Sequence, residues 1–265
     1  MEETILRGLI SGAFAGLSVD LTLYPIDTIK TRLQSSQGFN ASGGFRNIYR
    51  GMSSVVIGSA PSSALFFSTY SSVKHIVKSE SPLASSFAAI VAETVACIVR
   101  VPTELVKQRA QAENDRPIIA ICRDIYKNEG LCGFYRGYSS TVGREIPFSF
   151  IEYPLWELLK QQISSLFGIP YSPFISATCG SAAGSVAAAI TTPLDVTKTR
   201  IMLNEEKNPP GVILTLRNIA REGGVKLLYS GVLPRTLWMG IGGFIYFGAY
   251  ELMMKITFWL YPKVV

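Results

Sequence analysis

Long apolar stretches separated by polar segments dominate the pattern along this chain. Two of them, 51–73 and 173–194, are long enough to cross a membrane and contain no charged residue. Four further stretches of similar length contain isolated charges, which cost about 2.5–3.5 kcal/mol each at the centre of a bilayer on insertion scales. The pattern therefore indicates an all-α membrane protein, in which the isolated charges are candidate functional residues.

A ten-residue segment closes three of these stretches, at 25–34, 102–111 and 193–202. Each copy has a proline, an acid two residues later and a lysine three residues after the acid. A second element, an aromatic residue followed by any residue and a glycine, ends at Gly51, Gly137 and Gly231, before the next apolar stretch. Two elements that recur in step indicate three copies of one helix–loop–helix unit, over 1–78, 79–165 and 166–265 of a single domain.

These elements resemble the signature of the mitochondrial carrier family, which is Pro-x-acid-x-x-base-x-base-x-Gln followed by a Gly-bounded aromatic-basic element. The first two copies match in full, and the third has Met202 in place of glutamine. The resemblance implies six transmembrane helices, in three pseudo-symmetric repeats of two helices plus a short matrix helix around a central cavity. It also implies a multi-pass monomer of the inner mitochondrial membrane with lipid such as cardiolipin at its matrix helix ends.

By the same resemblance, the acid of each motif pairs with the lysine of a neighbouring repeat and closes the cavity on the matrix side. The residues of this matrix gate are Asp27, Lys30, Glu104, Lys107, Asp195 and Lys198, braced by Gln34 and Gln111. Met202 removes the third brace. On the cytoplasmic side two pairs are expected, Lys74 with Glu157 and Lys160 with Glu251, so this gate should be the weaker one.

The helices are expected at about 4–31, 52–78, 82–111 and 173–204, with two more beginning after Gly137 and Gly231. The segment 123–129 suits a short amphipathic helix at the membrane surface. The first loop is short and contains three glycines, so its matrix helix should be stunted.

Composition and charge agree with this topology. Of the 265 residues, 48% are hydrophobic and only 17% are charged. Of the 25 Lys and Arg, 16 lie in the three segments that run from the proline of each motif to the next repeated glycine, 25–51, 102–137 and 193–231, which places those segments toward the matrix and both termini toward the intermembrane space. The net charge of +6 therefore reflects topology and does not indicate nucleic-acid binding.

Charged side chains within the spans mark a candidate substrate site. Arg144 beside Glu145 can hold a carboxylate and an ammonium group, the two ends of an amino acid. Asp20 lies two turns before Asp27, on the same helix face. Glu93 and Arg100 share a face with the acid of the second motif, so Arg100 could contact substrate or pair with Glu104.

The resemblance adds positions one to two turns beyond each glycine of the even-numbered helices. These are Gly58, Ser59, Trp238 and Met239, together with Arg144 and Glu145. Gly58 should leave room for a bulky group, and Trp238 offers an indole face to a cation or a flat base.

An amino-acid group, an extra positive charge and an aromatic base together describe S-adenosylmethionine. The runs 27–34, 99–102 and 144–148 also resemble members of the family that carry this compound. The expected function is import of S-adenosylmethionine in exchange for S-adenosylhomocysteine, without a cofactor. A carrier of basic amino acids such as ornithine or lysine is the alternative, and it has less use for Trp238.

Two interpretations that assign the protein to a different functional class fit the sequence less well. A degenerate carrier with a structural or signalling role would not need three intact matrix pairs. An enzyme is disfavoured because the sequence has one histidine, His75, and no phosphate-binding glycine loop or nucleophile triad.

Overall fold

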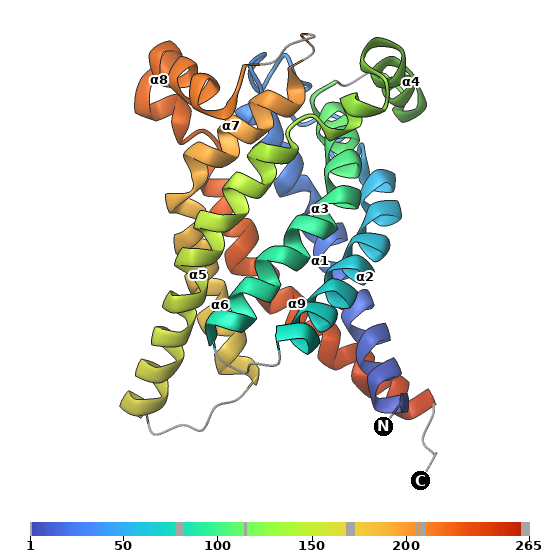
Figure 1. Cartoon of the computed structure of the whole chain (residues 1–265), viewed down its shortest axis with the longest axis vertical. Coiled ribbons are helices and arrows are strands. Elements are labelled where there is room, and N and C mark those ends of the chain that lie inside the picture. The colour runs from blue at the N-terminus through green and yellow to red at the C-terminus, as the bar shows by residue number, and fades with distance from the viewer. Residues whose placement is uncertain are drawn as a thin grey trace. The chain divides into compact units, whose positions relative to one another are not determined.

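The computed structural model describes residues 2–77, 82–113, 116–167, 173–204, 206 and 210–260. Within these ranges the chain forms nine α-helices and one 3-10 helix and no strand, so the predicted all-α class is confirmed (Figure 1). The elements are α1 (Glu2–Gln34), α2 (Met52–Val77), α3 (Pro82–Ala112), α4 (Ile118–Glu129), η1 (Leu131–Tyr135), α5 (Tyr138–Phe167), α6 (Pro173–Ile190), α7 (Thr192–Leu203), α8 (Val212–Leu228) and α9 (Val232–Leu260).

The chain divides into two compact units that cut across its repeats. The first unit comprises Met1–Asp27, Phe148–Ile190 and Val232–Val265, and the second comprises Thr28–Pro147 and Thr191–Gly231. Each unit therefore takes segments from all three repeats, and three of the four divisions, after Asp27, Ile190 and Gly231, fall at or beside the repeated proline and glycine elements.

The fifth predicted helix is not continuous, which corrects the expectation of one helix over 173–204. The chain breaks at Thr191 between α6 and α7, and the amide of Asp195 donates to the carbonyl of Thr191 at 3.2 Å to begin α7. Proline has no amide hydrogen and disfavours helical conformation in the residue before it, so Pro193 suits the start of a new helix. Pro25 and Pro102, by contrast, lie inside continuous helices.

The three repeats differ in the segment between their paired helices. In the second repeat α4 begins at Ile118, five residues before the predicted start, and it buries Ile121 and Ile125. In the third repeat α8 is bent at Gly224. In the first repeat residues 35–51 form turns without a helix, which confirms the predicted stunting.

Glycine at the start of each even-numbered apolar segment has a conformational reason. Gly51, Gly137 and Gly231 have φ of 88°, 86° and 76°, a region that side chains with a Cβ rarely adopt. A Cβ on Gly137 would also lie 2.8 Å from Cγ of Met202, so the backbone packs directly on that side chain. The repeated glycines thus mark the same turn in three places.

Within the second unit, α2 packs beside α3 (Figure 1). An apolar cluster joins α3, α4 and α7. Met202 of α7 is fully buried in this cluster, next to Leu105 and Ile125. Hydrophobic burial therefore holds α3, α4 and α7 together.

Within the first unit, α6 packs beside α9. The Ser185 hydroxyl donates to the carbonyl of Thr236 at 3.2 Å, and Phe148 of α5 packs on two alanines of α6. No single helix in the described ranges meets a length and hydropathy criterion for a membrane span, but Phe174–Ile190 and Thr192–Leu203 meet it together across their bend.

Candidate functional site

Two ion pairs join the proline motifs within the second unit. Lys30 Nζ of α1 is 2.7 Å from Oδ2 of Asp195 on α7. Gln34, one turn after Lys30, donates from Nε2 to the same oxygen at 2.9 Å. We call this contact of α1 with α7 the α1–α7 seam. Its acid is buried and receives an ammonium group and an amide from one neighbouring helix.

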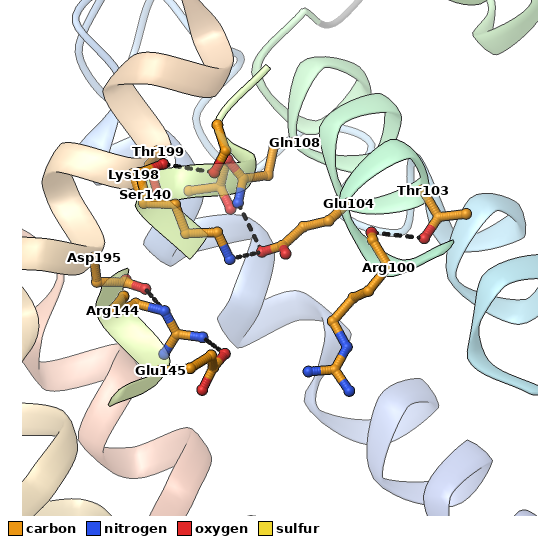
Figure 2. Close-up of polar contacts among 12 residues, drawn as sticks. Arg100, Thr103, Glu104, Gln108, Ser140, Arg144, Glu145, Asp195, Lys198 and Thr199 are labelled. Carbon is orange, nitrogen blue, oxygen red and sulfur yellow. Dashed lines mark hydrogen bonds and ion pairs between the residues drawn. The ribbon is translucent and has the colours of Figure 1, made fainter. Parts of the chain in front are cut away.

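The second pair joins Lys198 of α7 to Glu104 of α3, with 2.6 Å between Nζ and Oε1. We call this contact of α3 with α7 the α3–α7 seam. Gln108 Nε2 also donates to Glu104 Oε1, at 3.1 Å. Figure 2 shows the lysine and the glutamine approaching one carboxylate from two sides. Glu104 therefore has an ion-pair partner from α7 and an amide partner from its own helix.

The third predicted pair, Asp27 with Lys107, stays a prediction. Asp27 is the last residue of the first unit, whereas Lys107 lies in the second. The expected brace of this pair, Gln111, is fully buried and binds α1. Its Nε2 donates to the hydroxyl of Thr28 at 3.1 Å, and its Oε1 accepts from Thr31 at 2.9 Å.

Arg144 connects the candidate substrate site with the α1–α7 seam. Its guanidinium forms an ion pair with the neighbouring Glu145, and its Nε lies 3.7 Å from Oδ1 of Asp195 (Figure 2). The Arg144 and Glu145 side chains are 13% and 17% exposed. A guanidinium shared by two carboxylates can exchange one of them for the carboxylate of a ligand, because both present the same charged oxygen acceptors.

Arg100 has a different partner from the one that helix spacing suggests. It forms an ion pair with Glu93, seven residues earlier on α3, and not with Glu104. Glu104 is already bound by Lys198 and Gln108, so it has less capacity for a further cation. The two candidate substrate residues Glu93 and Arg100 therefore pair with each other, as Arg144 and Glu145 do.

The room predicted at Gly58 is filled, which corrects that expectation. Gly58 of α2 is buried, and a Cβ there would lie 2.5 Å from the hydroxyl oxygen of Thr103 on α3. The small residue allows two helix backbones to approach closely and leaves no space for a ligand at its own Cβ. Ser59, next along the helix, is half-buried.

Three candidate residues lie in the first unit. Asp20 of α1 and Trp238 of α9 are half-buried. Met239 packs on the cluster formed by Phe148, Ala187 and Ala188, so its observed contacts are those of a core residue.

The cytoplasmic pairs stay predictions. Lys160 lies 2.9 Å from Glu157 on its own helix, and its Nζ is 3.9 Å from the centre of the Trp156 ring. Lys74 lies over Tyr70 at 5.8 Å. Glu251, the predicted partner of Lys160, is exposed on α9.

Sequence reasoning missed Gln108 and the last basic residue of each motif. Arg32, Arg109 and Arg200 each donate from Nε to a main-chain carbonyl of another helix. The signal was present, because an arginine stands seven residues after each proline. Its geometric role could not be read from spacing, since the acceptors are carbonyls and carry no sequence signature.

Comparisons with known proteins agree with this arrangement of repeated motifs. The chain matches the family described as mitochondrial carrier protein in three segments, residues 2–81, 78–166 and 170–259. The chain belongs to the mitochondrial carrier family. It is therefore a member of a transporter family with three repeats, and the interpretation as an enzyme is excluded.

Several relatives share nearly half of their residues with this carrier. The mitochondrial S-adenosylmethionine carrier protein of Mus musculus is 48% identical over 251 residues, which covers 92% of each chain. The protein of the same name from Xenopus laevis is 48% identical over 250 residues, covering 92% of this chain and 94% of its own. A Drosophila melanogaster homologue is 46% identical over 261 residues, covering 94% of this chain and 92% of its own.

Proposed function

We propose that this carrier imports S-adenosylmethionine into the mitochondrial matrix in exchange for S-adenosylhomocysteine. The observation that carries the proposal is the identity of 46–48% across more than nine-tenths of the chain with carriers named for S-adenosylmethionine. The charge arrangement of the second unit supports it, because an arginine beside a glutamate suits the two ends of an amino acid.

In the proposed site, Arg144 receives the substrate carboxylate and Glu145 receives its ammonium group. The carboxylate then competes with Asp195 and Glu145 for one guanidinium. Glu93 and Arg100 supply a second acid and a second base in the same unit. Asp20 and Trp238 remain the sequence-based candidates for the sulfonium and the adenine, and each is tested by its own substitution.

Transport proceeds by alternating access in this proposal. Substrate binding must favour the state in which the matrix-side pairs are open, since equal affinity for both states would shift no population. Arg144 provides a route, because a substrate that withdraws it from Asp195 removes one of the cations beside a matrix-gate acid. The Lys30 and Lys198 ion pairs are the contacts that would then have to separate.

Exchange of these two compounds would move one positive charge, because the product lacks the sulfonium. A potential that is negative in the matrix favours inward movement of this charge by about 2.3 kcal/mol per 100 mV. The proposal places the carrier as a monomer in the inner membrane, with both termini toward the intermembrane space. Lipid such as cardiolipin is proposed at the matrix helix ends.

The test is uptake of labelled S-adenosylmethionine into liposomes that contain the purified carrier. Four samples are preloaded with S-adenosylmethionine, S-adenosylhomocysteine, ornithine or buffer alone. Uptake against both adenosyl compounds and not against ornithine is expected. Uptake against ornithine alone would replace this proposal with a basic amino-acid carrier.

Three variants assign the site. Arg144→Ala should reduce uptake at least about 100-fold, because one charged hydrogen-bonded contact contributes about 1.5–3 kcal/mol and the adjacent acid loses its partner as well. Asp20→Asn and Trp238→Ala should each raise the substrate concentration for half-maximal uptake. Arg217→Gln, on the exposed face of α8, is the matched control and should leave uptake unchanged. Normal uptake by Arg144→Ala would overturn the assignment of the amino-acid site.

A further inference from the structure

The matrix ends of α1, α3 and α7 are joined by one repeated hydrogen bond. Arg32 Nε donates to the carbonyl of Gln111 at 2.8 Å, and Arg200 Nε donates to the carbonyl of Gln34 at 3.0 Å. The third bond, from Arg109 Nε to the carbonyl of Met202, is longer, at 3.3 Å. The three acceptors are the last residues of the three motifs, so their side chains can be compared position by position.

At two of these contacts the acceptor residue is a glutamine held by a threonine. Thr31 donates to Oε1 of Gln111 at 2.9 Å, and Thr199 donates to Oε1 of Gln34 at 2.7 Å. Because the hydroxyl of Thr199 binds the amide oxygen of Gln34, the amide nitrogen of Gln34 faces Asp195 and donates to its Oδ2 at 2.9 Å. The threonine thus orients the brace.

At the α3–α7 seam both positions differ. Gln108 stands where the other motifs have Thr31 and Thr199, and Met202 stands where they have glutamine. Gln108 is 6% exposed, and its Nε2 binds the oxygen of Glu104 that also receives Lys198. Its Oε1 is buried without a hydrogen-bond partner among the described residues, and a methionine at 202 has no side-chain donor to offer it.

We propose that Gln108 is a positioning residue of the matrix gate and replaces the brace that Met202 cannot supply. Only the expected effect on the rate of exchange rests on the proposed transport function. Gln34 reaches from α1 to an acid on α7, so its hydrogen bond must break when the α1–α7 seam opens. Gln108 and Glu104 both lie on α3, so their bond persists when α3 leaves α7. The α3–α7 seam therefore opens with fewer hydrogen bonds broken.

The test replaces Gln108 and Met202 with the residues that stand at the same motif positions in the other two copies, threonine and glutamine. Gln108→Thr removes the brace, and the double variant Q108T/M202Q rebuilds the threonine–glutamine arrangement of the other two contacts. Gln108→Thr is expected to leave the exchange rate within about twofold of the parent at unchanged half-saturation, because the bond that it removes lies within α3 and is not broken on opening. The double variant is expected to slow exchange about tenfold, because its new glutamine reaches from α7 to Glu104 and that hydrogen bond to a carboxylate must break on opening.

Thermal unfolding of the purified carrier, measured without substrate, provides the second readout. Gln108→Thr should lower the midpoint, and the double variant should restore it, whether or not the parent transports an adenosyl compound. Gln162→Thr, the same substitution on an exposed position of α5, is the control that should change neither readout. Purely additive losses in the double variant, or an unchanged midpoint in Gln108→Thr, would overturn the proposal.

Discussion

The two seams of the second unit perform the same pairing with different chemistry. At the α1–α7 seam, Asp195 receives Lys30 and Gln34 from α1 and lies near Arg144. At the α3–α7 seam, Glu104 receives Lys198 from α7 and an amide from its own helix, and the brace position holds a buried methionine. The difference teaches that one sequence motif can close a contact with a buried acid that is braced from the facing helix, or with fewer polar bonds across the helices plus apolar packing.

The largest expected difference between the seams comes from removing each lysine. Lys198→Ala leaves Glu104 with Gln108 as its hydrogen-bond partner and no ion pair within 4 Å among the described residues, whereas Lys30→Ala leaves Asp195 with Gln34 as a hydrogen-bond partner and Arg144 at 3.7 Å. Loss of one partner of a buried ion pair typically costs about 3–5 kcal/mol, so Lys198→Ala should approach that range and Lys30→Ala should fall below it. Chemical unfolding of both variants checks this order, and equal losses would contradict the comparison.

A smaller effect is expected when the methionine is transplanted to the other seam. Gln34→Met removes the hydrogen bonds to Asp195 and from Thr199, and it leaves a buried hydroxyl and a buried carboxylate with one partner fewer each. A loss of about 2–3 kcal/mol of unfolding free energy is expected, since a hydrogen bond to a charged group contributes about 1.5–3 kcal/mol. If the double variant Q34M/T199Q recovers the unfolding free energy, a glutamine on the helix of the acid can replace the brace at the α1–α7 seam as well. If it does not recover, this replacement works only on α3.

The salt bridge between Arg200 of α7 and Glu222 of α8 should contribute least to stability. Arg200 Nη1 lies 3.3 Å from Glu222, whose side chain is 55% exposed. Exposed pairs contribute about 0–1 kcal/mol and are screened by salt, so Glu222→Gln should change the unfolding free energy by less than about 1 kcal/mol. A larger loss that persists at high salt would show that α8 contributes to the α1–α7 seam through this contact.

The smallest effect is expected in the alkylation rates of two cysteines, one of which lies at the apolar side of the α3–α7 seam. Cys122 of α4 packs on that cluster, and burial raises the pKa of its thiol, whereas Cys132 is exposed. Because the thiolate is the reactive form, a raised pKa lowers its fraction at neutral pH. Cys132 should therefore be alkylated first at pH 7, and labelling of Cys122 should accelerate as the pH rises. Equal rates at pH 7 would show that α4 separates readily from the seam.

Much of the helical arrangement follows from local pattern. The described ends of α1, α2 and α3 lie within about three residues of the predicted ends, since apolar periodicity and proline act on neighbouring residues. The break at Thr191 was missed because prolines in the same motif position are accommodated inside α1 and α3. A kink and a break have the same sequence signal, and packing decides between them.

The sequence by itself determined the family, the three repeats and the residue types that form ion pairs between the proline motifs, because these depend on composition and spacing. Only the tertiary structure decided which partner each charged group takes. Arg100 binds Glu93 because Glu104 is occupied, Gly58 packs on Thr103, and Gln108 supplies an amide that Met202 lacks. Partner choice is a competition between side chains of different helices, and distances between helices are not encoded in the spacing along any one of them.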